Sequence, residues 1–145
     1  LYVTIFIVYL KKFTMKNKMD KILAEISAGE LIDKITILEI KKERINDIDK
    51  IKNVEKELIS LNDTLKKSIP NYSSIKTLAV KLKSINIKLW DIEDGKRLAE
   101  KKNDFGEHFI QLARDVYKEN DERSKVKSQI NKILNSNVQE VKSHY

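Results

Sequence analysis

The sequence contains no cysteine, three glycines, one proline and two histidines among its 145 residues. Without cysteine the chain forms no disulfide, no cysteine-ligated zinc site and no thiol nucleophile. His108 and His144 lack the ligand spacing of a zinc motif, so we expect no metal centre. The isolated glycines exclude a phosphate-binding loop that needs several glycines at fixed offsets. We therefore expect no cofactor.

Charged and aliphatic residues are abundant instead, at 35% charged and 41% hydrophobic. Many Lys, Glu, Leu and Ile with few Gly and Pro favour an all-α protein. The length is typical of one domain that can bury a core. The absence of cysteine fits a reducing compartment, and we expect a cytoplasmic protein.

The first eighteen residues differ from the rest, because the apolar run LYVTIFIVYL is followed by a basic stretch without acids. This run is shorter than the roughly twenty residues of a membrane span. Its basic residues follow the apolar run, whereas they precede it in a signal peptide. We interpret residues 1–18 as a leader translated from upstream of a true start at Met15 or Met19; the alternative is a truncated membrane anchor. The domain is expected at residues 19–134, with an irregular tail at 135–145.

Ser27 and Glu30 have the spacing of a capping box, so a helix is expected to begin there. Apolar residues then recur mostly every three or four positions until Pro70, which predicts one helix of about forty residues. These positions are Leu31, Ile35, Leu38, Ile45, Ile48, Ile51, Val54, Leu58, Leu61 and Leu65.

A second helix is expected after a cap at residues 72–74, with a heptad line from Ile75 to Ile92. If the chain folds back at Pro70, the two apolar lines pair in a constant antiparallel register, from Leu65 with Ile75 to Ile48 with Ile92. The sequence therefore predicts a long, coiled-coil-like antiparallel hairpin.

A third helix is expected from Asp104 to about residue 134, because Asp104 and Glu107 form a second capping pattern. Breaks are possible at Gly95 or at residues 103–104, and an unbroken helix over 74–134 stays open. Together these elements form an all-α bundle. Because the first helix is longer than its partners can cover, we expect a homo-oligomer or a protein partner.

The net charge of +7 resembles that of a nucleic-acid or membrane binder. Four of the lysines lie in residues 1–18, so residues 19–145 carry 25 basic and 22 acidic residues, a net charge of +3. The lysine-rich segment 75–90 is expected beside the acid-rich segment 47–63. We therefore do not expect nucleic-acid binding, and expect membrane contact only if residues 1–18 are native.

Charged residues also stand where apolar lines should continue, and a buried unpaired charge is costly. In the predicted register Glu43 lies opposite Arg97. Such groups either pair and fix the helix register, or they line a pocket whose arginines bind a phosphate or carboxylate beside an aromatic ring. The candidate ligand-binding residues are Glu43, Arg44, Trp90, Asp94, Arg97, Arg114, Tyr117, Asn120, Asp121 and Arg123. Glu39 or Glu43 could serve as an acid or base, but no catalytic residue is assigned.

Four sequence blocks resemble an uncharacterised family of short helical bacterial and phage proteins. They are EISAGELIDKITILEIK (25–41), LWDIEDGKR (89–97), LARDVYKENDER (112–123) and EVKS (140–143). The resemblance runs from about residue 20 to the end and leaves residues 1–18 outside. It implies a stand-alone helical domain, sometimes found beside sugar-transfer enzymes of surface-polysaccharide synthesis. A weaker likeness to all-helical chorismate mutases covers one helix, in which Ile32 and Asp33 lead to Arg44.

We expect a non-enzymatic interaction or assembly module, accessory to surface-polysaccharide or glycan synthesis. The alternative is a small all-helical enzyme or sensor that binds an anionic metabolite at the Arg/Glu cluster.

Overall fold

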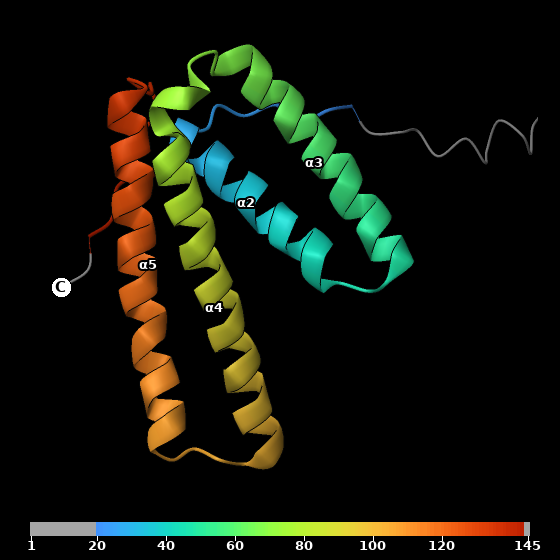
Figure 1. The fold of residues 1–145 in the computed structure, drawn as a ribbon, viewed down its shortest axis with the longest axis vertical. Helices are drawn as coiled ribbons and strands as arrows, with labels where there is room; N and C mark the ends of the chain where they lie inside the picture. Colours follow the sequence, from blue (N-terminus) through green and yellow to red (C-terminus); the bar gives the residue numbers. More distant parts are fainter. Residues whose placement is uncertain (1–19, 144–145) are drawn as a thin grey trace, which may run out of the picture.

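The computed structural model describes residues 20–143, and within them it has four α-helices, one short 3-10 helix and no strand. The elements are α2 (Ala28–Arg44), α3 (Ile48–Ser68), η1 (Tyr72–Ile75), α4 (Lys76–Lys102) and α5 (Glu107–Ile133). Helices α4 and α5 form an antiparallel hairpin, and α2 packs on both of them (Figure 1). The all-α prediction is confirmed. The predicted leader, residues 1–18, lies outside the described residues.

The prediction of a single helix of about forty residues is wrong, because the helix is interrupted between α2 and α3. Ile45 has extended backbone angles (φ −94°, ψ 132°), and the Asp47 carboxylate caps α3 by accepting from the amides of Asp49 and Lys50 at 3.0 and 3.1 Å. An aspartate that binds its own following amides favours a helix start over a helix interior. The apolar spacing continues in phase across this break, so periodicity alone did not reveal it.

The predicted antiparallel pairing, from Leu65 with Ile75 to Ile48 with Ile92, is also wrong, because α3 and α4 do not pack against each other as helices. Helix α3 folds back on α2, and α2 occupies the place beside α4 (Figure 1). A constant register shows only that two apolar lines are able to face each other. Because the chain turns at residues 45–47, the apolar line of α3 packs on α2 instead of on α4. Leu58, Leu61 and Leu65 still pack at the edge of the common core.

The hairpin between α4 and α5 turns at Asn103, whose left-handed backbone (φ 53°) ends α4. An unbroken helix over 74–134 is therefore excluded. The capping box expected at Asp104 is wrong, because α5 begins at Glu107 with Gly106 as N-cap. The Asp104 carboxylate instead accepts from the Gly106 amide at 3.3 Å. Helix α5 ends at Ile133, close to the expected position.

The core lies where α2, α4, α5 and η1 meet, and its most buried aliphatic side chains are Ile32, Ile40, Ile75, Leu82, Val126 and Ile130. Gly29 lets α2 approach α5 closely. A Cβ added there would lie 2.6 Å from the backbone oxygen of Lys127, well inside van der Waals contact. This close approach brings polar side chains of the two helices together.

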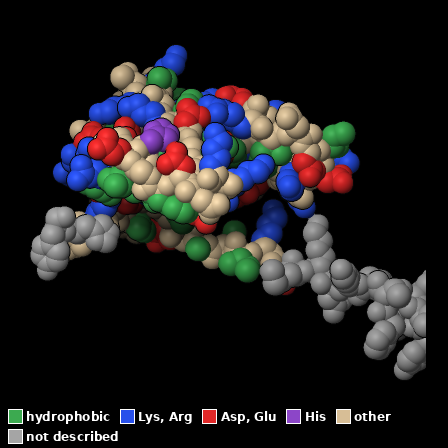
Figure 2. Space-filling model, turned by 90° about the horizontal axis from the view of Figure 1, so that it is seen from below, with side chains coloured by type: hydrophobic (Ala, Val, Ile, Leu, Met, Phe, Trp, Pro, Cys, Tyr) green, Lys and Arg blue, Asp and Glu red, His purple; other side chains and the backbone are tan. Residues whose placement is uncertain are grey.

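The lysines of α4 do pair with acids, but not with those of residues 47–63. Lys83 contacts Glu39 and Glu43 of α2 at 3.0 and 2.9 Å. Two further pairs join α4 to α5: Lys81 with Glu122 at 3.8 Å and Lys88 with Glu119 at 3.3 Å. Acidic and basic side chains also alternate over the face shown in Figure 2. None of the helices between residues 20 and 143 combines the length and apolarity of a membrane span.

Candidate functional site

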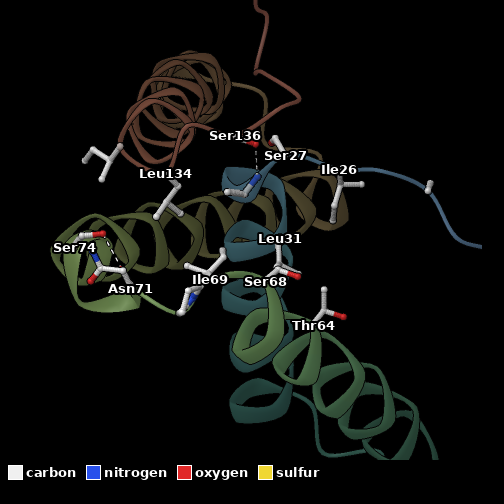
Figure 3. Close-up of a pocket in the computed structure, with 14 residues that line it drawn as sticks. Ile26, Ser27, Leu31, Thr64, Ser68, Ile69, Asn71, Ser74, Leu134 and Ser136 are labelled. Carbon is white, nitrogen blue, oxygen red and sulfur yellow. Dashed lines mark hydrogen bonds between the residues drawn. The ribbon is translucent and has the colours of Figure 1, made fainter.

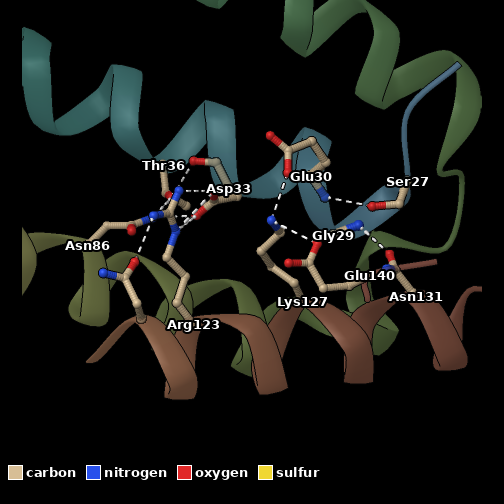
Figure 4. A network of polar contacts seen from close by, with 11 residues as sticks. Ser27, Gly29, Glu30, Asp33, Thr36, Asn86, Arg123, Lys127, Asn131 and Glu140 are labelled. Atoms are coloured by element: carbon tan, nitrogen blue, oxygen red, sulfur yellow. Dashed lines mark hydrogen bonds and ion pairs between the residues drawn. The ribbon is translucent and has the colours of Figure 1, made fainter. Parts of the chain in front are cut away.

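Polar side chains from three helices meet at the interface between α2 and α5 (Figure 4). Asp33 of α2 is fully buried. The Nε of Arg123 on α5 donates to its two carboxylate oxygens at 3.0 and 3.1 Å, and Nη2 donates to Oδ2. A forked, charge-assisted contact of this kind fixes both the position and the orientation of the guanidinium.

Asn86 of α4 completes this cluster. Its Nδ2 donates to Asp33 Oδ1 at 2.8 Å and to the Thr36 hydroxyl at 2.9 Å, and that hydroxyl donates to the Asp33 carbonyl oxygen. The hydrogen bond with Asp33 raises the pKa of Arg123 above its usual value and outweighs the opposing effect of burial. The cluster thus ties α2, α4 and α5 together and holds Arg123 charged.

Arg123 also lines a cavity of about 290 Å³ between α2, α4 and α5, which we name the Trp90 cavity. Its lining residues are Ile37, Ile40, Asn86, Leu89, Trp90, Glu93, Asp94, Arg97 and Arg123. Four of the residues predicted from the sequence therefore come together: Trp90, Asp94, Arg97 and Arg123. Within residues 20–143, Arg97 forms no ion pair or hydrogen bond through its side chain.

Two predicted residues lie outside this cavity because other charges hold them. Glu43 pairs with Lys83 at 2.9 Å, and Arg44 pairs with Asp91 at 2.7 Å. The pKa of Lys83 is raised by its hydrogen bond to Glu43, against the effect of burial and with the help of Glu39. The predicted neighbourhood of Glu43 and Arg97 depended on the wrong helix register, and these residues do not line a common cavity.

A second cavity, of about 520 Å³, also has Arg123 in its lining, and we name it the Lys127 cavity. Its lining residues are Val116, Tyr117, Asn120, Arg123, Ser124, Lys127, Glu140, Val141 and Lys142. The predicted residues Tyr117 and Asn120 belong here, and Asn120 Oδ1 accepts from Arg123 Nη1 at 3.3 Å. Asp121 lies nearby and pairs with Lys142.

Arg114 is exposed and lines neither the Trp90 cavity nor the Lys127 cavity. The predicted set is therefore divided between two cavities and the surface around them.

Sequence reasoning missed Lys127, whose side chain is 9% exposed and contacts Glu30 at 2.7 Å and Glu140 at 3.0 Å. Burial would lower the pKa of Lys127, but the hydrogen bonds to both carboxylates outweigh it and raise that pKa. The sequence predicts Glu30 only as a member of a capping box. The Ser27 hydroxyl does accept from the Glu30 amide at 3.1 Å, as predicted, while the Glu30 carboxylate binds Lys127 (Figure 4).

A spacing of four residues on α5 could have revealed this face. Arg123, Lys127 and Asn131 recur at the helical repeat, and each binds α2. Asn131 is fully buried, and its Oδ1 accepts from the Gly29 amide at 2.6 Å. Polar residues at this spacing within an apolar line indicate an interface with a polar partner.

A cavity of about 630 Å³, larger than the Trp90 and Lys127 cavities, lies at the N-terminal end of α2, next to the turn between α3 and η1 (Figure 3). Apolar side chains such as Leu31, Ile69 and Leu134 line it together with serine and threonine hydroxyls. None of its lining residues is charged, so it offers no ion pair to an anion and no acid or base. Size alone therefore does not make it the better functional candidate.

The chemistry available around Arg123 is binding through forked donors, carboxylates and one aromatic ring. Glu39 and Glu43, the acid or base candidates, both contact Lys83 and line neither named cavity. In the described part of the chain, no group of three or more His, Asp or Glu residues is arranged to hold a metal ion.

Comparison with curated proteins and with solved structures finds no significant match to this chain. A family profile does match, over residues 22–145, and its description is "Family of unknown function (DUF6165)". This match spans nearly all of the chain and includes all four helices. The chain belongs to this family.

Proposed function

We propose that the protein is a non-enzymatic binding module for a small acidic metabolite, with the Trp90 cavity as its binding site. One observation carries this proposal: Arg97 and Arg123 line the same cavity as Trp90, and Arg97 has no acidic partner within residues 20–143.

The two arginines have different roles in this proposal. Asp33 neutralises Arg123 and fixes its orientation, so Arg123 offers directed donors with little net charge. Arg97 supplies a positive charge without an ion-pair partner in residues 20–143. Glu93 of the same lining pairs with Lys96 at 3.0 Å, and Asp94 remains as a carboxylate in the cavity. A guanidinium binds phosphate or carboxylate through two parallel hydrogen bonds, which favours an oxyanion over a neutral group.

The remaining lining residues favour a hydroxylated ring as the body of the ligand. Trp90 offers an apolar face on which a ring can stack, and the Asp94 carboxylate can accept hydrogen bonds from hydroxyl groups. The volume of about 290 Å³ is near the lower end of the roughly 300–1,000 Å³ typical of small-molecule sites. We infer an acidic or phosphorylated monosaccharide, which agrees with an accessory role in surface-polysaccharide or glycan synthesis.

Binding is favoured over catalysis because Glu39 and Glu43, the acid or base candidates from the sequence, lie outside the Trp90 cavity, and its own carboxylates, Glu93 and Asp94, have no assigned catalytic role. Lys83 contacts both Glu39 and Glu43, and neither residue lines the Trp90 cavity.

Isothermal titration calorimetry with glucose 6-phosphate, glucuronate and uncharged glucose tests this proposal. We expect both acidic sugars to bind the wild type more tightly than glucose does. Arg97→Ala should weaken their binding by about tenfold or more, the loss of one charge-assisted contact. Arg114→Ala is the matched control, since it removes an exposed arginine outside the cavity. Equal binding by the two variants would contradict the proposal.

A second candidate function is self-assembly, and exposed apolar residues near the turn of the α4–α5 hairpin favour it. Leu98, Phe105 and Ile110 are each about half exposed, at 52%, 49% and 50%. The hairpin extends beyond α2 at this end (Figure 1). Residues 94–114 carry four acidic and five basic residues, so a second copy of this chain would meet little net repulsion.

The break at residues 45–47 removes the earlier reason for an oligomer, an overlong first helix, so the hairpin end is now the basis of this candidate. Light scattering coupled to size exclusion tests it. A dimer that Leu98→Ser and Phe105→Ser together convert to a monomer would support self-assembly. The control is Ile59→Ser, on an exposed residue of α3. A monomeric wild type at high protein concentration would contradict it.

A further inference from the structure

The Lys127 cavity gathers basic and hydroxyl side chains on the side of α5 that faces the C-terminal segment. Arg123, Lys127 and Lys142 line it, together with the hydroxyls of Tyr117 and Ser124. Arg123 here also binds Asp33 and Lys142 also binds Asp121, but proteins hold a phosphate group with donors of these kinds. The cavity of about 520 Å³ has room for one.

A carboxylate that lines this cavity, Glu140, already pairs with Lys127. Glu140 accepts from the Lys127 ammonium at 3.0 Å, and its own side chain is 23% exposed. Lys127 is nine-tenths buried, so its charge requires a partner. Glu30 provides one partner at 2.7 Å, and Glu140 provides the second.

The two carboxylates are held differently. Glu30 lies in the first turn of α2, where the helix and its Ser27 cap fix the backbone. Glu140 lies in residues 136–143, which have no helix or strand. This segment is attached on both sides of Glu140: the Ser136 hydroxyl accepts from the Ala28 amide at 3.1 Å, and Lys142 pairs with Asp121 of α5. Because Glu140 lies outside the helices, its side chain can turn away from Lys127 without a change in the packing of α2 on α5.

We propose that the Lys127 cavity is a second anion site, specific for a phosphate group, and that Glu140 is an internal competitor that masks it. A phosphate group brings up to two negative charges and three acceptor oxygens, against the single charge and two oxygens of a carboxylate. It can replace Glu140 at Lys127 and also accept from Ser124 and Arg123. This site shares Arg123 with the Trp90 cavity but does not include Arg97 or Trp90, so it does not depend on the function proposed for that cavity.

Titration of inorganic phosphate by calorimetry tests the competition, with every protein carrying Arg97→Ala so that the Trp90 cavity does not contribute. Glu140→Gln should tighten phosphate binding by roughly tenfold or more, because it removes the competing charge. Glu122→Gln is the matched control. It also replaces a glutamate with glutamine, but at a residue of α5 that pairs with Lys125 and Lys81 and does not line the Lys127 cavity. Adding Lys127→Met to Glu140→Gln should abolish binding.

Equal phosphate affinity of Glu140→Gln and Glu122→Gln would overturn the proposal, as would binding that survives Lys127→Met.

Hydrogen exchange of the wild type gives a test without variants at Lys127 or Glu140. Phosphate should speed amide exchange in residues 138–143 and leave the interior of α5 unchanged. Unchanged exchange in this segment at saturating phosphate would also overturn the proposal.

The same titration with glycerol 3-phosphate and with vesicles containing phosphatidic acid identifies the source of the phosphate group. Binding of the soluble ester supports a metabolite, while binding confined to vesicles supports a lipid headgroup. Failure of both probes and of inorganic phosphate with Glu140→Gln would refute the site. None of these outcomes bears on whether Arg97 binds an acidic sugar.

Discussion

The guanidinium of Arg123 binds the carboxylate of Asp33 across the α2–α5 interface, with Nε 3.0 Å from one oxygen and 3.1 Å from the other. The two residues are 90 positions apart in the sequence. Asp33 is buried, while the Arg123 side chain is 28% exposed. The same arginine lines the Trp90 cavity and the Lys127 cavity. This pair therefore links the packing of the helices to both candidate binding sites.

Arg123→Met should destabilise the fold by about 3 kcal/mol, because it leaves the Asp33 charge buried without its partner. Urea denaturation followed by circular dichroism measures this free energy of unfolding. In the double variant Asp33→Asn, Arg123→Met, the free energy of unfolding should fall by clearly less than the sum of the decreases in the two single variants, since both charges are removed together. Additive losses, or a single loss below about 1 kcal/mol, would show that the pair contributes little.

Gly29→Ala should destabilise the fold by about 1–3 kcal/mol, because its Cβ meets the Lys127 backbone at 2.6 Å and α2 must move away from α5. Gly95→Ala is the control. Its Cβ meets the Leu112 Cδ1 atom at 3.1 Å, the end of a side chain that can rotate, and alanine is up to about 1 kcal/mol better than glycine inside a helix. Thermal unfolding should therefore separate the two variants. Equal melting temperatures would contradict the close approach of α2 and α5.

Lys127 should make stability fall at high pH. Its pKa is raised in the folded protein, because the bonds to Glu30 and Glu140 outweigh burial. Its stabilisation is thus complete below the unfolded pKa of about 10.4 and is lost as pH rises through the folded value. The difference in unfolding free energy between the wild type and Lys127→Met should stay constant from about pH 6 to 9 and shrink above about pH 10. A difference that does not change up to about pH 11.5 would contradict this linkage.

Much of the fold follows from local sequence signals. The helical class, the Ser27 cap, the stop at Pro70 and the end of α5 each depend on nearby residues. The break at residues 45–47 does not disturb the apolar period, because Leu38, Ile45 and Ile48 stay in phase across it. Its signal was the side chain of Asp47, which binds the amides that follow it. Once that break is missed, the wrong helix is placed beside α4.

The candidate site could be predicted in part. Arg97 and Asp94 were predicted from an extended register that is wrong, and Trp90 was predicted as an aromatic ring beside the arginines. Arg123 was predicted because charged residues interrupt the apolar line of the third helix. Asp33 was not, although it stands between Ile32 and Ile35 on the buried face of α2. A carboxylate in that position needs a cation, and the sequence contains 29. Which of these lysines and arginines pairs with Asp33 depends on the packing of α2 on α5, and local spacing does not determine that packing.

Trp90 makes the central claim directly measurable, because it is the single tryptophan of the chain and lines the proposed cavity. Its fluorescence should change saturably as glucose 6-phosphate is added to the wild type and to Arg114→Ala, and should change far less in Arg97→Ala. An emission spectrum that stays the same with acidic sugars at millimolar concentration, or an identical titration of Arg97→Ala, would contradict binding in the Trp90 cavity.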